Sequence, residues 1–96
     1  MPATELPQLK PQADGFLLSG PVVLETVSAL VDRFPGDSAT VSIDLKQITQ
    51  ADSAALTLFL AWKRKAKKKG VPLRFTNWPD NLMSLVRLYR LESILV

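Results

Sequence analysis

The spacing of apolar and polar residues predicts an α/β arrangement of strands and helices. Residues 40–44 alternate in polarity and are rich in β-branched side chains, which is typical of a strand with Val41 and Ile43 on one face. Residues 53–69 follow as the longest helix, and Gly70 is a natural residue to end it. A strand followed directly by a long, mostly apolar helix indicates a buried central strand in an α/β sheet.

The remaining segments complete the predicted order β-β-α-β-α-β-α-β. Strands are expected at residues 16–19, with an antiparallel partner within residues 6–13, at residues 73–76, and at residues 91–96 on the sheet edge; helices are expected at residues 22–34 and from Pro79 onward. Asp14-Gly15 is a hairpin signal, and Gly20-Pro21 should end its second strand. Pro35-Gly36-Asp37 should end the first helix.

These elements predict one domain over residues 1–96, with a mixed sheet of about five strands packed against about three helices. Three prolines in residues 1–12 restrict any strand there to a ragged sheet edge, and residues 1–8 are expected to be ragged or disordered.

The composition argues against an enzyme. The chain contains no His and no Cys, so it lacks the commonest general base, the commonest metal ligand and any thiolate nucleophile. The carboxylates are scattered at turns and element ends, and no glycine-rich phosphate loop is present. We therefore expect no catalytic residue, no metal site, no cofactor and no small-molecule substrate. Neither a signal peptide nor a membrane-spanning segment is expected.

The net charge of +3 conceals an asymmetry between the two halves of the chain. Residues 1–45 carry two basic residues against six acidic ones, whereas residues 46–96 carry ten against three. Much of the positive charge lies in residues 63–69, a run that could bind nucleic acid or anionic lipid. We favour a solvated helix end instead, because cations are stabilised there and the run has no interleaved aromatic residues.

Asp52-Ser53, at the start of the long helix, is the main candidate for a functional site. Asp52 is suited to cap the helix, which is worth about 1 kcal/mol, and the Ser53 hydroxyl could then be incidental. The same helix start also favours an anion, so a phosphoryl group on Ser53 would be well placed locally, although Asp52 would repel it. The apolar run in residues 54–62 is either a core helix or partly a protein interface.

At these residues the chain resembles a STAS domain, the module found in sulphate transporters and anti-sigma-factor antagonists. The resemblance extends over nearly the whole chain from about Leu9. It rests on the element order and on Ile43-Asp44-Leu45 followed, after six intervening residues, by Asp52-Ser53-Ala54-Ala55-Leu56. The family pattern is a strand ending in Asp-Leu, a short loop, and Asp-[Ser/Thr]-x-Gly-Leu at the helix start. Residues 16–20, 68–70 and 88–91 add to the resemblance.

Within this family the chain is most similar to the small STAS subunits of Mla phospholipid ABC transporters. The resemblance implies a non-catalytic regulatory and assembly subunit that binds the cytoplasmic ATPase subunit. It would reach the permease and the inner membrane indirectly, from the cytoplasm, and would not bind nucleic acid. The implied contact surface comprises Ser53, as contact and possible phospho-acceptor, with Thr49, Gln50, Asp52, Ala54, Ala55, Leu56 and Thr57.

An anti-sigma-factor antagonist switched by phosphorylation of Ser53 is the alternative that the same family offers. The hydroxyl residue after the Asp is the phospho-acceptor in that branch, and Ser53 occupies its position. Ala55 stands where the family usually has Gly, and the usual long final helix is absent or lies beyond the end of the given sequence. Both departures weaken the case for the anti-sigma branch, and neither excludes it.

Overall fold

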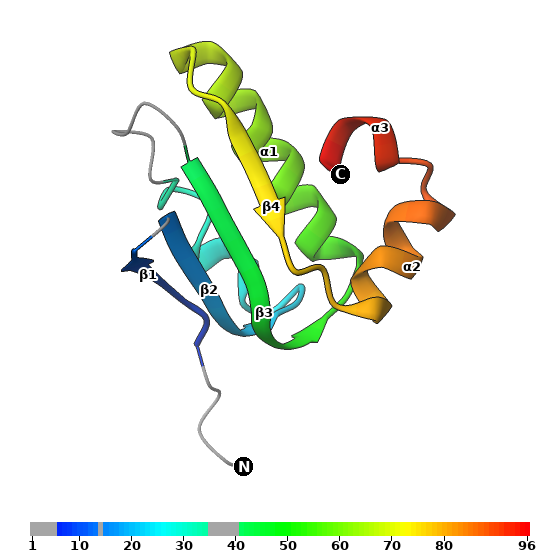
Figure 1. Ribbon diagram of the computed structural model, residues 1–96. Helices are drawn as coiled ribbons and strands as arrows, with labels where there is room; N and C mark the ends of the chain where they lie inside the picture. Colours follow the sequence, from blue (N-terminus) through cyan, green and yellow to red (C-terminus); the bar gives the residue numbers. More distant parts are fainter. Residues whose placement is uncertain (1–5, 14, 35–40) are drawn as a thin grey trace.

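The computed structural model describes residues 6–13, 15–34 and 41–96. Within these residues the fold is built on a four-stranded mixed sheet. The strands lie in the order β1 (Gln8–Gln12), β2 (Gly15–Val22), β3 (Val41–Ala51) and β4 (Leu73–Thr76), with β1 antiparallel to β2 and the other pairs parallel. The helical elements are η1 (Val27–Ala29), α1 (Ser53–Lys69), α2 (Asp80–Leu88) and α3 (Glu92–Leu95). Figure 1 shows α1 against one face of the sheet, with α2 and α3 beside it. The predicted α/β class is confirmed.

The core lies between this sheet and α1. Alternate residues of β3, among them Val41, Ile43 and Leu45, turn to α1 and are fully buried. From the helix side, Phe59 and Trp62 are also fully buried. The ring centroids of Phe59 and Trp62 lie 6.4 Å apart. The Phe59 ring also packs against Phe75 of β4 and Trp78 in the segment after β4. The long apolar run of α1 is therefore mainly a core surface.

β3 is longer than the predicted strand of residues 40–44. It continues to Ala51 because its second half pairs in parallel with β2, ending at the register Val22↔Ala51. Residues 46–50 are mostly exposed and therefore mostly polar, so they lack the apolar alternation by which a strand is predicted from sequence. The extension places Asp52 and the start of α1 directly after the strand.

The predicted hairpin is confirmed on both sides of Asp14, a residue that lies outside the described part. Gln12 pairs with Gly15, and β1 forms the expected edge strand, which tolerates Pro11. The prediction that Gly20-Pro21 ends β2 is wrong, because β2 runs through both residues to Val22. Irregular register between β2 and β3 at this point accommodates them.

The helix predicted over residues 22–34 is wrong. Only the single turn η1 forms there, and the predicted stop at Pro35-Gly36-Asp37 lies outside the described residues. Thr26 gives the physical reason: its buried hydroxyl donates to the Pro21 carbonyl at 2.8 Å and accepts from the Val23 N–H at 3.0 Å. These side-chain bonds replace helical bonds and hold a turn. Leu30 still reaches the core and is fully buried.

α1 begins and ends at the predicted residues, and its caps explain why. Asp52 has an extended backbone and accepts from the Ala54 N–H at 2.9 Å, while Gly70 takes a left-handed conformation with φ of 70°. β4 and the start of α2 after Pro79 are likewise confirmed.

The final strand predicted over residues 91–96 is wrong, because the short helix α3 forms there. α2 ends at Leu88, and Arg90, with φ of 57°, turns the chain after it. The Leu91 N–H donates to the Val86 carbonyl at 2.9 Å. The turn brings Leu95 into the core, where it is 2% exposed. The described sheet therefore has four strands instead of about five.

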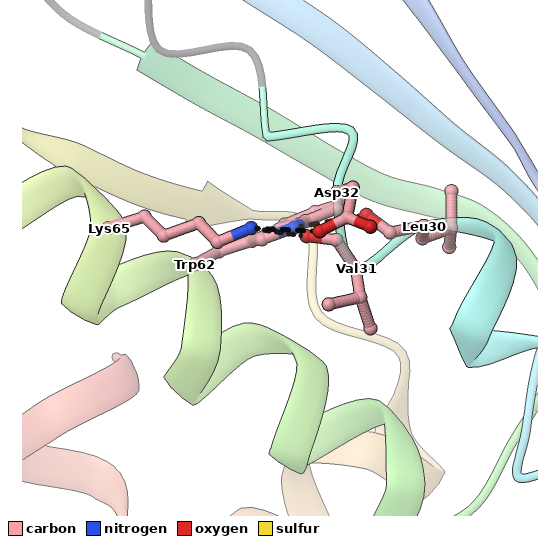
Figure 2. Close-up of polar contacts among 5 residues, drawn as sticks. All are labelled: Leu30, Val31, Asp32, Trp62 and Lys65. Carbon is pink, nitrogen blue, oxygen red and sulfur yellow. Dashed lines mark hydrogen bonds and ion pairs between the residues drawn. The ribbon is translucent and has the colours of Figure 1, made fainter.

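Two side chains of α1 tie this helix to the segment after η1. The Trp62 indole N–H donates to the Leu30 carbonyl at 3.3 Å, and the Lys65 ammonium donates to the Val31 carbonyl at 2.8 Å. Lys65 also lies 3.7 Å from the Asp32 carboxylate. Figure 2 shows these contacts converging on the irregular segment, which is thereby positioned beside α1.

Candidate functional site

Asp52 joins two segments at the N-terminal end of α1. One carboxylate oxygen accepts from the Ala54 N–H at 2.9 Å, and the other accepts from the Leu24 N–H at 3.1 Å. The first bond caps the helix, and the second fixes the loop after β2 beside the helix start. The predicted capping role of Asp52 is confirmed.

Ser53 follows as the first residue of α1 and is exposed. Its carbonyl lies 3.5 Å from the Thr57 hydroxyl, which is one turn farther along the same exposed face of the helix. Because Asp52 supplies the cap, the Ser53 side chain is left on the surface at the positive end of the helix dipole.

Two hollows border this face, and Ser53 and Thr57 line both. The first, which we call the η1-side hollow, has a volume of about 530 Å³. It is lined by Leu24, Val27, Val31, Asp52, Ser53, Ala54, Thr57, Leu58 and Ala61. The second, the α2-side hollow, has a volume of about 400 Å³ and is lined by Ser53, Leu56, Thr57, Leu60, Tyr89 and Leu91. The helix start therefore projects between two largely apolar depressions, an arrangement suited to a protein contact.

The structure brings most of the predicted surface residues together, but not all. Thr49 and Gln50 are exposed at the end of β3, and Ala54 is half-buried in the η1-side hollow. Ala55 and Leu56, however, belong to the core, where Ala55 is fully buried and Leu56 is 2% exposed. Both residues occupy the face of α1 that packs inside the domain, although Leu56 also lines the α2-side hollow. Their role as contact surface stays a prediction.

Sequence reasoning missed the apolar residues that other elements contribute to this surface. Leu24 is 73% exposed on the η1 side, and Tyr89 is 51% exposed after α2. Neither residue is near Ser53 in the sequence. The sequence offers no clear signal for Leu24, because single exposed Leu residues are common on protein surfaces.

Two charged side chains that do not line these two hollows have perturbed pKa values. Burial alone would raise the pKa of Asp44. Hydrogen bonds from the Lys46 N–H and the Asn77 side chain, together with the positive charge of Lys46, outweigh burial and lower this pKa below its usual value. Burial lowers the pKa of Lys63, whose ammonium donates to the Leu73 carbonyl at 2.7 Å. Asp44 thus contacts its own strand and the turn after β4, and Lys63 joins α1 to the start of β4.

Within residues 6–13, 15–34 and 41–96, no three His, Cys, Asp or Glu side chains are grouped so that they could hold a metal ion. The helices of the same ranges are all too short or too polar to cross a membrane.

Comparisons with known proteins agree with this architecture. No curated protein matches the chain. Among solved structures, the anti-sigma factor antagonist SpoIIAA in its unphosphorylated form is similar, with a TM-score of 0.63 and 14% identity, over 85% of this chain and 82% of that one. A structure of Mglu matches with a TM-score of 0.56 and 18% identity, over 76% of this chain but only 19% of that one. At these identities the likeness shows the fold alone.

A family comparison covers almost the whole sequence. Residues 7–96 match the family described as "Mlab, STAS domain". The match includes the sheet, the Asp52-Ser53 helix start and both hollows. The chain therefore belongs to the STAS domain family.

Proposed function

We propose that this protein is a non-catalytic binding subunit that docks through the N-terminal end of α1. The exposed Ser53 between two apolar hollows carries the proposal. A partner could surround the helix start and place apolar side chains in both hollows, which is the arrangement of a buried anchor in a protein interface. Exposed Leu24 and Tyr89 would lose their contact with water on such docking.

The partner we propose is the cytoplasmic ATPase subunit of a phospholipid-transporting ABC complex. Family membership supports this choice, because the matching family carries the description "Mlab, STAS domain". The resemblance of the sequence to the STAS subunits of Mla transporters supports it further. In this role the protein would stabilise and regulate the ATPase, and it would reside in the cytoplasm at the inner membrane through its complex.

Co-purification of the ATPase subunit with Ser53 variants tests the proposal. Ser53→Arg should reduce binding by about a hundredfold or more, because a long charged side chain would fill the space that the partner must enter. Ser53→Ala should bind within a few-fold of wild type, since it removes only the hydroxyl. Ser84→Arg, the same change at an exposed position of α2 outside both hollows, is the matched control. Equal binding by wild type and Ser53→Arg would exclude this surface.

An anti-sigma-factor antagonist is the second candidate, and the exposed hydroxyl of Ser53 favours it. A phosphoryl group there would meet the positive end of α1 but would repel the adjacent Asp52. In this role a kinase-like anti-sigma factor would phosphorylate Ser53, and the added charge would release the partner. Mass spectrometry after incubation with such a partner and ATP should then show one phosphate in wild type and none in Ser53→Ala.

A further inference from the structure

The surface around Ser53 continues along α1 as two grooves. A third hollow of about 330 Å³ shares Leu60 with the α2-side hollow, and a fourth of about 450 Å³ shares Ala61 with the η1-side hollow. Arg64 lines both of these further hollows. The outer face of α1 is therefore a ridge that runs from Ser53 past Arg64 with a groove on each side.

The far end of this ridge carries positive charge that the described part of the chain does not neutralise. α1 contains no acidic residue. Lys63 and Lys65 are held by backbone carbonyls, and Lys65 also lies near Asp32. Arg64, Lys67 and Lys68 are exposed and form no ion pair within the described residues. Lys67 lines the third hollow and Lys68 the fourth, so these cations border the grooves directly.

The chemistry of the ridge thus changes along its length. Near Ser53 no basic residue lines the grooves, and both oxygens of Asp52 already accept hydrogen bonds. Beyond Leu60 and Ala61, the charged residues that line the grooves are all basic. Four turns of helix separate the two ends, or about 22 Å. A complementary ligand needs apolar groups at one end and negative charge about 20 Å away.

We propose that the partner docks an acidic amphipathic helix along α1. Its apolar side chains would fill the hollows beside Ser53, and its carboxylates would meet Arg64, Lys67 and Lys68. This inference rests on the proposed function, because it assigns the chemistry of the partner segment at the same surface. A protein helix fits better than a lipid surface, since a flat bilayer would touch the ridge but could not enter both grooves along its length.

A synthetic peptide tests this inference without the natural partner. The probe is a helical peptide of about 18 residues, with Leu anchors in its first half and Glu in its last two turns. Titrated into ¹⁵N-labelled protein, it should shift the amide signals of Ser53, Thr57, Arg64 and Lys68 saturably, and less so at high salt. Replacing its Glu residues by Gln should weaken binding about tenfold.

Charge reversal in the protein provides the matched comparison. Arg64→Glu/Lys68→Glu should weaken peptide binding about tenfold or more. The same reversal at two exposed arginines off the ridge, Arg74→Glu/Arg87→Glu, should leave it unchanged. Arg64→Gln/Lys68→Gln should lie between wild type and the reversed variant. Thermal unfolding of each variant checks that the fold is intact.

Three outcomes would overturn the inference. The first is peptide binding that does not saturate or that maps to the sheet. The second is binding of wild type to vesicles of phosphatidylcholine with phosphatidylglycerol in the absence of peptide binding. The third is ATPase binding that Ser53→Arg abolishes but Arg64→Glu/Lys68→Glu leaves unchanged, which would keep the proposed function intact. Conversely, saturable peptide binding with no ATPase binding by wild type would support the inference and reject the proposed partner.

Discussion

At the scale of single residues, Asp52 shows how one side chain shapes a surface. Its two oxygens bind N–H groups from different segments, one in α1 and one in the loop after β2. Capping and partner binding are therefore separate tasks of adjacent residues: Asp52 holds the helix start, and Ser53 is left exposed.

Asp52→Ala should lower the free energy of unfolding by about 1–2 kcal/mol, because it removes the helix cap and the bond to the Leu24 N–H. Asp52→Asn keeps one acceptor oxygen and should lose less. Urea denaturation followed by circular dichroism measures both values. A wild-type stability in Asp52→Ala would show that neither bond contributes to folding.

Asp44 should make stability depend on pH in the acid range. Its pKa in the folded protein is lower than the ordinary value of 3.8, so its contribution is fully present above that pH and is lost as the pH falls through the folded pKa. Wild type should therefore be more stable than Asp44→Asn at pH 6, and the difference should shrink below pH 3.8. Denaturant titrations at several pH values measure it; a difference that grows on acidification would contradict the assignment.

At the scale of elements, two glycines, one at the end of α1 and one at the start of β2, are required for different reasons. Gly70 ends α1 in a left-handed conformation, and a Cβ atom there would meet nothing within 4 Å. Gly15, with φ of 141°, lies so close to the backbone of Ser42 that a Cβ atom would collide with it. The first glycine is needed only for its conformation, whereas the second is also needed for the space it leaves.

Alanine at these two glycines should therefore have unequal effects. Gly70→Ala should cost about 1 kcal/mol of unfolding free energy, the penalty for a left-handed alanine. Gly15→Ala should cost more than about 2 kcal/mol, because strain and a backbone clash add. Thermal unfolding of the two variants side by side checks the order. Equal losses would mean that the β2–β3 approach can relax at no cost.

At the scale of the whole molecule, one aromatic cluster joins the layers. Phe59 from α1 lies 4.6 Å from the ring of Phe75 in β4 and 5.7 Å from that of Trp78 in the segment before α2, centroid to centroid. Trp62 extends the cluster to the segment after η1 through its bond to Leu30. The surface that carries Ser53 is thus held by the same helix that organises the core.

Phe59→Ala should therefore destabilise the whole domain, by about 3–5 kcal/mol. For a domain of this size that is a large part of the total stability, so partner binding should be lost with the fold. Phe59→Leu should retain most of the stability and, because Phe59 is buried away from the hollows, should bind the partner normally. Unfolding and binding assays on both variants separate the effects; weak binding by a folded Phe59→Leu would place Phe59 in the contact itself.

The sequence by itself determined the elements whose signals are local. α1 has a capping Asp at one end and a Gly at the other, the hairpin has Asp14-Gly15, and β4 lies between Pro72 and α2. The position of Ser53 at the helix start followed from the same signals. Residues 43–56 carried enough of the family pattern to identify a STAS domain, which the match over residues 7–96 confirms.

The tertiary structure decided what depends on distant contacts. Pairing with β2 extended β3 through polar residues, and the bonds of Thr26 to Pro21 and Val23 replaced a helix by a turn. Burial of Leu95 favoured α3 where local propensity indicated a strand. The grooves beside Ser53 exist only because Leu24 and Tyr89 approach α1 from opposite sides. Such contacts leave no periodic trace in a sequence, since they join residues far apart along the chain.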